Sequence, residues 1–319
     1  MLQIRVLGSA AGGGFPQWNC RCPNCAGLRA GRIKARPRRE ASLAVSADGA
    51  SWFLLGATAD LRSQIESCPP LHPKEAGAPR QSPVAGILLS NGDLDQCLGL
   101  LALREDQPLH VYATARVRQG FTGSNVLYRT LDRFAGQVTW HRLLPHEPSP
   151  LAAPSEAPGD GEARTREAAL EVTALPLPGK VPLHLQARLQ PDPEDNVALL
   201  IRDRTSGRSL AYLPSVAEDG PVLRRLLDQA DCVFFDGTFW SEDELLALGI
   251  GRRRASDMAH WPLAGPGGSL AVLARSRAAL RILIHINNTN PILREDSPER
   301  QQVEAAGVQV AYDGLELRL

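Results

Sequence analysis

A chain of 319 residues is long enough for one large domain or two modest ones. Its content of 43% hydrophobic and 22% charged residues is that of an ordinary globular protein and argues against disorder over the whole length. The 35 basic and 35 acidic side chains cancel, so no net charge favours nucleic acid or a membrane surface. No apolar run reaches the ~18–20 residues that a membrane span needs.

The chain opens on a predicted strand, Gln3–Leu7, which leads into a glycine-rich turn at Gly12–Gly14. It lacks the basic segment, apolar segment and cleavage site of a secretory signal, so no signal peptide is expected. Six cysteines do not make a disulfide scaffold in a chain of this length, and three of them crowd into six positions. The sequence therefore predicts a cytoplasmic protein that binds a metal.

Short apolar and β-branched runs typical of strands recur along the chain. They are Gln3–Leu7, Ser42–Ser46, Ser51–Leu55, Ala85–Leu89, Leu109–Ala113, Asn196–Ile201, Ser209–Leu213, Cys232–Phe235, Arg281–His285 and Gln309–Tyr312. Helices are expected between many of them, at Ala59–Ser67, Leu94–Arg104, Val222–Gln229 and Pro298–Ala306. Strands in series, followed by strands alternating with helices, predict an α/β fold, an αβ/βα sandwich of mixed sheets covered by helices.

Two stretches are predicted to be loops. Cys68–Pro83 contains five prolines and no periodic apolar pattern, and Leu144–Ala168 is rich in Pro, Ala, Glu and Gly. We expect the second stretch, 144–168, to be a mobile insertion. Neither stretch is convincing as a domain boundary, so residues 1–319 are predicted to form a single domain.

Three cysteines follow the glycine turn in the order Cys20-Arg-Cys22-Pro-Asn-Cys25. Thiolates two and three residues apart in a tight loop can converge on one tetrahedral ion, and zinc is the usual occupant. Three thiolates close the site around the ion, so a structural zinc is expected. The sequence does not identify the fourth ligand that such a site requires. Three unrelated small side chains in a loop are the alternative.

A segment in the first half, Ser90–Gln96, resembles a metal-binding segment of metallo-β-lactamase-fold hydrolases. It lies between a predicted strand and a predicted helix, where those hydrolases carry T-H-x-H-x-D-H. Asn91, Asp93 and Gln96 stand at the three histidine positions, and Asp95 keeps the aspartate position. Amides are weak zinc ligands and an aspartate is a good one, so a two-zinc hydrolase site is not expected. Capping of the helix N-terminus is the alternative role for the two aspartates.

Blocks spread along the whole chain identify it as similar to the PqqB family, the pyrroloquinoline quinone (PQQ) biosynthesis proteins B. The similar blocks are RVLGSAAGGGFPQWNC (Arg5–Cys20), Ser82–Asp95, FFDGTFW (Phe234–Trp240), HINNTNPIL (His285–Leu293) and AYDGLE (Ala311–Glu316). The resemblance implies a metallo-β-lactamase-like four-layer αβ/βα sandwich, a cytoplasmic protein and a role in making PQQ. It also implies either hydroxylation of a tyrosine ring by iron, or transport of PQQ or its precursor. The precursor derives from a glutamate and a tyrosine of a peptide, and other PQQ biosynthesis proteins are possible partners.

Later in the chain, three residues add groups that bind metals or move protons. Asp236 ends an apolar strand, His260 lies in a loop before a glycine-rich stretch, and His285 ends another strand. Related hydrolases carry an acid and two histidines at similar positions. A hydrogen-bonded turn acid and satisfied polar residues at strand ends are the alternatives. Asn287, Asn288 and Asn290 are candidates to bind a carboxylate-rich quinone or dipeptide, or to stiffen the loop that they occupy.

These residues predict one metal ion in place of two. We expect Asp93, His260 and His285 to bind it, with Asp95 and Asp236 orienting the ligands. Asp95, Asp236 and His260 are thus the candidate catalytic residues. A carboxylate with two histidines and open positions is typical of non-haem Fe(II) oxygenases, which fits hydroxylation of a Glu-Tyr precursor. A non-catalytic carrier of the quinone or its precursor and a metal-dependent phosphodiesterase are the alternatives.

Overall fold

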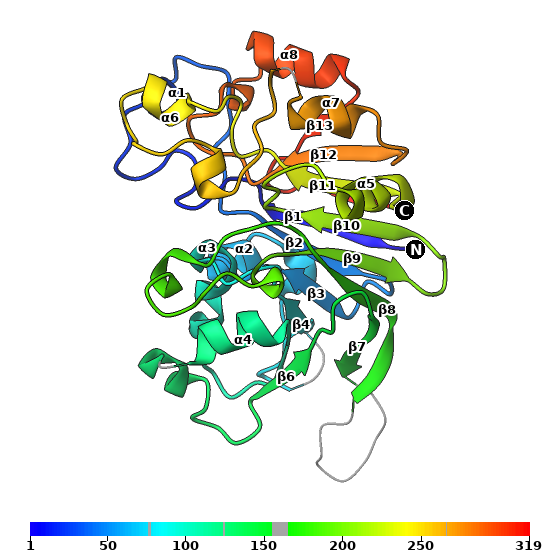
Figure 1. The fold of residues 1–319 in the computed structure, drawn as a ribbon. Helices are drawn as coiled ribbons and strands as arrows, with labels where there is room; N and C mark the ends of the chain where they lie inside the picture. Colours follow the sequence, from blue (N-terminus) through cyan, green and yellow to red (C-terminus); the bar gives the residue numbers. More distant parts are fainter. Residues whose placement is uncertain (76–77, 124, 155–164, 266) are drawn as a thin grey trace.

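The computed structural model describes residues 1–75, 78–123, 125–154, 165–265 and 267–319 (Figure 1). Its described strands form two sheets of seven strands each. The first sheet has the order β14-β1-β2-β3-β4-β5-β6, and the second has the order β13-β12-β11-β10-β9-β8-β7. Both sheets contain parallel and antiparallel neighbours, so both are mixed.

The first sheet consists of β1 (Gln3–Gly8), β2 (Ser42–Ser46), β3 (Trp52–Leu55), β4 (Val84–Leu88), β5 (Leu109–Ala113), β6 (Val138–Arg142) and β14 (Glu316–Arg318). The second consists of β7 (Pro148–Pro154), β8 (Thr165–Pro176), β9 (Val197–Asp203), β10 (Ser209–Leu213), β11 (Cys232–Asp236), β12 (Leu280–Ile284) and β13 (Gln309–Val310). The α-helices are α1 (Pro23–Arg29), α2 (Leu61–Glu66), α3 (Leu94–Cys97), α4 (Ala115–Thr122), α5 (Pro221–Gln229), α6 (Glu244–Ala247), α7 (Ser269–Ala274) and α8 (Pro298–Ala305).

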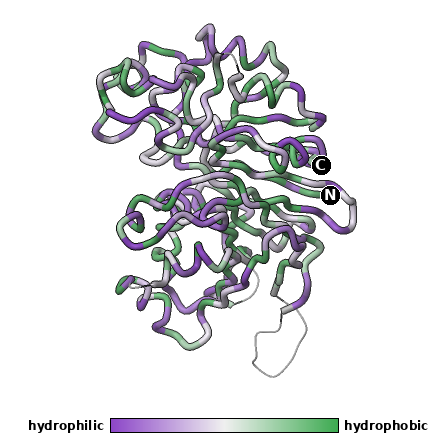
Figure 2. Tube along the Cα trace, in the orientation of Figure 1, coloured by the Kyte–Doolittle hydropathy of each residue, from purple (hydrophilic) through white to green (hydrophobic). Residues whose placement is uncertain are grey.

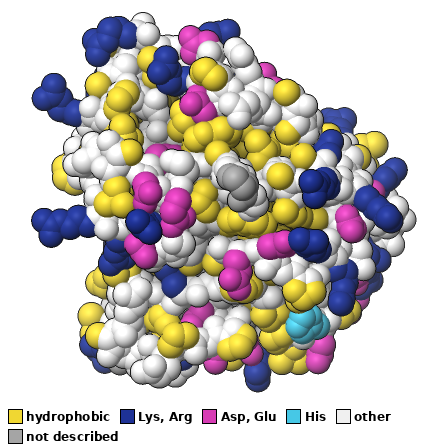
Figure 3. All heavy atoms as spheres, turned by 45° about the horizontal axis from the view of Figure 1, so that its top comes forward, with side chains coloured by type: hydrophobic (Ala, Val, Ile, Leu, Met, Phe, Trp, Pro, Cys, Tyr) yellow, Lys and Arg dark blue, Asp and Glu magenta, His cyan; other side chains and the backbone are white. Residues whose placement is uncertain are grey.

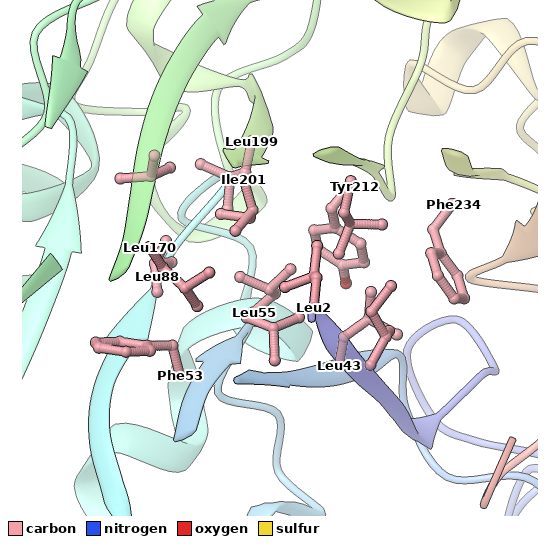
Figure 4. Packing of buried hydrophobic residues seen from close by; sticks show 14 of the residues in the cluster. Leu2, Leu43, Phe53, Leu55, Leu88, Leu170, Leu199, Ile201, Tyr212 and Phe234 are labelled. Atoms are coloured by element: carbon pink, nitrogen blue, oxygen red, sulfur yellow. The ribbon is translucent and has the colours of Figure 1, made fainter. Parts of the chain in front are cut away.

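The core between the sheets is built from side chains of both. Leu43 and Phe53 of the first sheet pack with Leu170 and Ile201 of the second (Figure 4). Hydrophobic segments accordingly run along the strands at the middle of the molecule (Figure 2). A second apolar cluster joins the outer face of the second sheet to α5, α7 and α8, and a third joins the outer face of the first sheet to α2 and α4. The helices therefore form two outer layers around two sheets, and the predicted αβ/βα sandwich is confirmed.

The segment 144–168, predicted to be a loop, is a strand over most of its described length. It contains β7 and the start of β8, which pair antiparallel, with Pro148 opposite Thr173. Residues 155–164 lie outside the described part of the chain. Proline cannot donate a backbone hydrogen bond to a neighbouring strand, but among the described strands β7 is the last in its sheet and pairs on one side only. The prolines that suggested a loop therefore fit an edge strand.

The surface carries both signs of charge side by side. The face drawn in Figure 3 shows both Lys and Arg side chains and Asp and Glu side chains, several of them next to one another. This distribution agrees with the balance of 35 basic and 35 acidic residues. Of the described helices, none is long and apolar enough to cross a membrane.

Candidate functional site

The candidate residues lie where strands of both sheets end. Asp236 is the last residue of β11, and His285 directly follows β12, which runs parallel to β11. Asp93 and Asp95 follow β4 and lie at the start of α3. Parallel neighbours end at the same edge of a sheet, and the edges of the two sheets meet here, so residues far apart in the sequence come together.

Asp236 is a fully hydrogen-bonded buried carboxylate. Its Oδ2 accepts from Val216 N at 2.9 Å and lies 2.6 Å from His260 Nδ1. Its Oδ1 accepts from Thr238 N at 2.9 Å and from Thr238 Oγ1 at 2.5 Å. Asp236, His260 and His285 have possible ligand atoms within 4.8 Å of one another, but these four bonds occupy both oxygens of Asp236. Asp236 therefore orients His260 and leaves His260 Nε2 for a metal or a substrate.

His285 is held from both ring nitrogens. Its Nδ1 lies 2.8 Å from Thr238 Oγ1, and its Nε2 lies 2.9 Å from Asp95 Oδ2. The Thr238 hydroxyl has a single proton and lies 2.5 Å from Asp236 Oδ1 and 2.9 Å from His285 O; the shorter contact to the carboxylate takes the proton, so the hydroxyl oxygen accepts from His285 Nδ1–H. The rings of His260 and His285 stack with centroids 5.3 Å apart. The structure thus brings both predicted histidines together through Thr238, which sequence reasoning missed.

The charges in this cluster depend on one another. Burial by itself raises the pKa of Asp236, but the charges of His260 and His285 and the hydrogen bonds from His260 and Thr238 bring the pKa below its usual value. Burial likewise raises the pKa of Asp95, and the hydrogen bond and charge of His285 lower it further than burial raises it. Burial lowers the pKa of His285, but its bond to Asp95 and the nearby carboxylates raise the pKa above the usual value. Without a metal, these contacts therefore favour the protonated form of His285 beside the carboxylates.

Two residues of this site have an unusual backbone. Ala259, directly before His260, has φ of 60°, and His285 has φ of 57°. Non-glycine residues rarely adopt this left-handed region and need support from their surroundings. Backbone strain therefore falls at the two positions that fix the histidines, which is typical of functional sites.

The cluster opens into a cleft of about 560 Å³. The lining residues include Glu40, Asp93, Asp95, Lys180, His260 and His285. Asp93 occupies the N-cap position of α3, yet its side chain makes no capping hydrogen bond within the described structure. Its Oδ2 lies 3.8 Å from Lys180 Nζ instead, which argues against the capping alternative for Asp93.

Glu40 is a second lining residue that sequence reasoning missed. Its carboxylate accepts from Gly13 N at 2.8 Å and from Ala59 N at 3.0 Å, and thereby holds the glycine turn against the cleft. Burial raises the pKa of Glu40 above its usual value, although these backbone bonds lower it in part. A glutamate that follows two arginines carries no local signal of this role, because Gly13 and Ala59 are far from it in the sequence.

The three cysteines of the predicted zinc cluster converge at the start of α1. Their Sγ atoms lie within 4.8 Å of one another, and Cys22 and Cys25 are buried. Cys22 N donates to Cys20 Sγ at 3.3 Å, and Cys25 N donates to Cys22 Sγ at 3.4 Å. All six cysteines of the chain are free thiols, as a metal-binding cluster requires.

The three predicted asparagines separate into different places. Asn287 lines the cleft. Asn288 faces the cysteines, with its Nδ2 at 3.2 Å, 3.6 Å and 3.3 Å from the three Sγ atoms. Asn290 is fully buried, and its side chain bonds Gly237 O and Ile292 N. The side chains of Asn288 and Asn290 are not among those that line the cleft, and their contacts fit the alternative role of stiffening the loop.

Comparison with known proteins agrees with this geometry. Residues 51–286 match the family model described as "Beta-lactamase superfamily domain". The chain is 42% identical over 318 residues to coenzyme PQQ synthesis protein B of Stutzerimonas stutzeri, and 44% identical over 320 residues to that of Cupriavidus necator, with full coverage of both chains. It also resembles the crystal structure of Zn²⁺-bound PqqB from Methylobacterium extorquens, with a TM-score of 0.87, 39% identity, and coverage of 99% of this chain and 100% of the other.

Fold and family model together define a member of the beta-lactamase superfamily. Within it, the chain belongs to the family of coenzyme PQQ synthesis protein B. A diphosphatase of the PhnP family shares the fold, with a TM-score of 0.65 at 18% identity. That likeness shows the architecture alone.

Proposed function

We propose that this protein acts in PQQ biosynthesis as an iron-dependent hydroxylase of a tyrosine-derived, Glu-Tyr-type precursor. The names of its relatives support the pathway. The observation that carries the chemistry is a pair of stacked histidines and a carboxylate at one cleft, with His285 Nε2 2.9 Å from Asp95 Oδ2. Two histidines and a carboxylate with open positions suit Fe(II).

The donor set fits a single ion. His260 Nε2, His285 Nε2 and a carboxylate of Asp93 or Asp95 would hold it, and the charges of these groups act on one another's pKa values. Asp236 is assigned an orienting role because its oxygens are occupied by four hydrogen bonds. When bound, iron would supply the activation of O₂ that hydroxylation of a phenol requires.

The chain's own residues would prepare the site. Asp236 fixes the ring of His260 through Nδ1, and Thr238 fixes the ring of His285 through Nδ1, so each ring presents Nε2. The hydrogen bond between His285 Nε2 and Asp95 raises the pKa of His285 and favours a proton on Nε2, which a cation bound at Nε2 would displace. Glu40 holds the glycine turn that forms one wall of the cleft.

The test is turnover by protein loaded with Fe(II) without oxygen and then exposed to O₂ and a Glu-Tyr peptide. The wild-type protein should yield a hydroxylated peptide, and His285→Ala should not. His72→Ala is the matched control, because His72 does not line the cleft and its ring lies 3.0 Å from Glu66 O. Absence of product from the iron-loaded wild type, or undiminished product from His285→Ala, would refute the hydroxylase.

We further propose a structural zinc at the cysteine cluster, with Asn288 as its fourth ligand. With Zn–S bonds of about 2.3 Å and a Zn–O bond of about 2.0 Å, the apex of a tetrahedron lies roughly 3.5 Å from each sulfur. The side-chain amide of Asn288 lies 3.2–3.6 Å from the three sulfurs. Amide oxygen and nitrogen are interchangeable by a flip, so Oδ1 can occupy this position. Asn24 Nδ2 donates to Asn288 O at 3.1 Å and fixes its backbone.

A non-catalytic carrier of PQQ or its precursor is the second candidate. One observation favours it: the buried carboxylates and histidines of the site satisfy one another without any metal. A carrier would bind PQQ equally tightly before and after removal of metal by a chelator, and would yield no hydroxylated peptide.

The free thiols agree with the predicted cytoplasmic location, which stays a prediction.

A further inference from the structure

The cleft has an unusual balance of charge. Its lining includes three carboxylates, those of Glu40, Asp93 and Asp95, and Lys180 is the sole lysine or arginine lining it within the described residues. A ligand that carries carboxylates would meet repulsion from such a surface unless a cation were placed to receive it. Lys180 is therefore the residue on which recognition of an anionic ligand depends.

The contacts of Lys180 hold its ammonium group in place but do not use all of its hydrogen-bond donors. Its Nζ donates to Met258 O at 2.8 Å and lies 3.8 Å from Asp93 Oδ2. The first contact is a hydrogen bond, whereas the second is longer than the 2.7–3.2 Å that is usual for such bonds. An ammonium group has three N–H donors, so donors remain for a ligand. The side chain is 29% exposed, which leaves its head accessible from the cleft.

The contacts of Lys180 also join two walls of the cleft. Asp93 comes from the loop after β4 of the first sheet, and Met258 comes from the loop that leads to His260. Lys180 itself lies after β8, in a stretch between Pro178 and Pro182. The backbone carbonyl of Met258 and the carboxylate of Asp93 therefore hold the ammonium group close to the proposed metal ligands, where it can bind an anionic group.

We propose that Lys180 binds a carboxylate of the substrate and so selects carboxylate-bearing, tyrosine-derived ligands. This inference rests on the proposed function, because it takes the cleft with His260 and His285 as the substrate site. Neutralisation of Asp93 alone is the competing role, and it predicts no preference for charged over neutral ligands. The two roles differ in a measurement that needs no turnover.

The experiment measures binding of two peptides by calorimetry to the full-length, zinc-loaded protein. Glu-Tyr is the charged probe, and Gln-Tyr amide, which has no carboxylate, is the neutral probe. Lys180→Gln should weaken binding of Glu-Tyr by about 10- to 100-fold, the range expected for a hydrogen bond to a charged group. It should leave binding of Gln-Tyr amide unchanged. Lys180→Arg keeps the charge and should retain most of the affinity for Glu-Tyr.

The matched control is Lys34→Gln. Lys34 has a similar ion pair, 3.7 Å from Glu295, but lies outside the cleft, so both peptides should bind as to the wild type. Metal content and melting temperature are measured for each variant, so that loss of zinc or of folding is recognised. Equal weakening of both peptides by Lys180→Gln, or no weakening of Glu-Tyr, would overturn the inference.

Wild-type protein that binds the two peptides equally would also overturn it. The outcome is independent of the hydroxylase test. If the protein prefers the carboxylate-bearing peptide but hydroxylates no peptide, the proposed role of Lys180 stands and only the hydroxylase proposal is refuted. If Lys180→Gln hydroxylates the peptide as the wild type does, the hydroxylase proposal stands and only the proposed role of Lys180 is refuted.

Discussion

Thr238 joins the two halves of the proposed metal site, so its hydroxyl is the most informative group to remove. It donates to Asp236 Oδ1 and accepts from His285 Nδ1, while Asp236 in turn holds His260. Thr238→Val keeps the branched shape and deletes the hydroxyl. Asp236 Oδ1 then retains only the bond from the residue 238 backbone N–H, and His285 Nδ1–H loses its acceptor.

The expected loss of stability follows from the burial of the two residues that this hydroxyl contacts. His285 and Asp236 are both buried, and an unsatisfied buried donor costs roughly 1–3 kcal/mol of unfolding free energy. Loss of a residue that orients a metal ligand typically lowers metal affinity about 10- to 100-fold. Within the described part of the chain, the hydroxyl of Thr238 contacts Asp236 and His285 and none of the cysteines, so the zinc content of the cysteine cluster should not change.

Anaerobic calorimetric titration with Fe(II) measures the affinity, on protein whose cysteine cluster already carries zinc. Thr238→Ser restores a hydroxyl and should restore most of the affinity, which separates the role of the hydroxyl from that of packing. Iron bound by Thr238→Val as tightly as by the wild type would refute the reasoning that Thr238 sets the histidine orientation.

The remaining predictions concern the zinc cluster and a buried acid. Asn288→Ala should lose zinc to a chelator faster than the wild type. Asn288→Asp keeps an oxygen at the same place and should retain the zinc. Equal rates of zinc release from the wild type and both variants would contradict ligation by residue 288. Burial raises the pKa of Glu244 to about 7, so the native carboxyl keeps a proton that the unfolded chain has lost. The free energy of unfolding should therefore fall by up to ~3 kcal/mol as the pH rises from about 4.5 to about 7. Urea unfolding across this range checks it, and Glu244→Gln should abolish the fall.

The layered fold could be predicted because its strands carry their own signal. Ser42–Ser46 and Ser209–Leu213, for example, are buried along their whole length and read as short apolar runs. The missed strand β6 is different, because Val138–Arg142 is only partly buried and mixes polar with aromatic residues. β7 was missed because its prolines are compatible with a strand only at a sheet edge, and edge position is a property of the whole sheet.

Part of the site could likewise be predicted, because some of its residues carry a signal in their own side chains. Asp95, Asp236, His260 and His285 have side chains whose chemistry marks them, and the structure gathers them at one cleft. The role of Thr238 depends on partners that its own segment does not contain. Asn288 and Asn287 are neighbours in sequence, yet one faces the cysteines and the other the cleft, because adjacent side chains in this loop point to opposite sides.

Element-specific metal analysis of protein purified without oxygen tests the central claim most directly, that the chain holds a thiolate zinc site and a separate iron site. Wild-type protein should contain about one zinc and one iron per chain. His285→Ala should lose the iron and keep the zinc, and a triple Cys20, Cys22 and Cys25 to Ser variant should lose the zinc. Zinc alone in the wild type, or iron that survives in His285→Ala, would contradict the account.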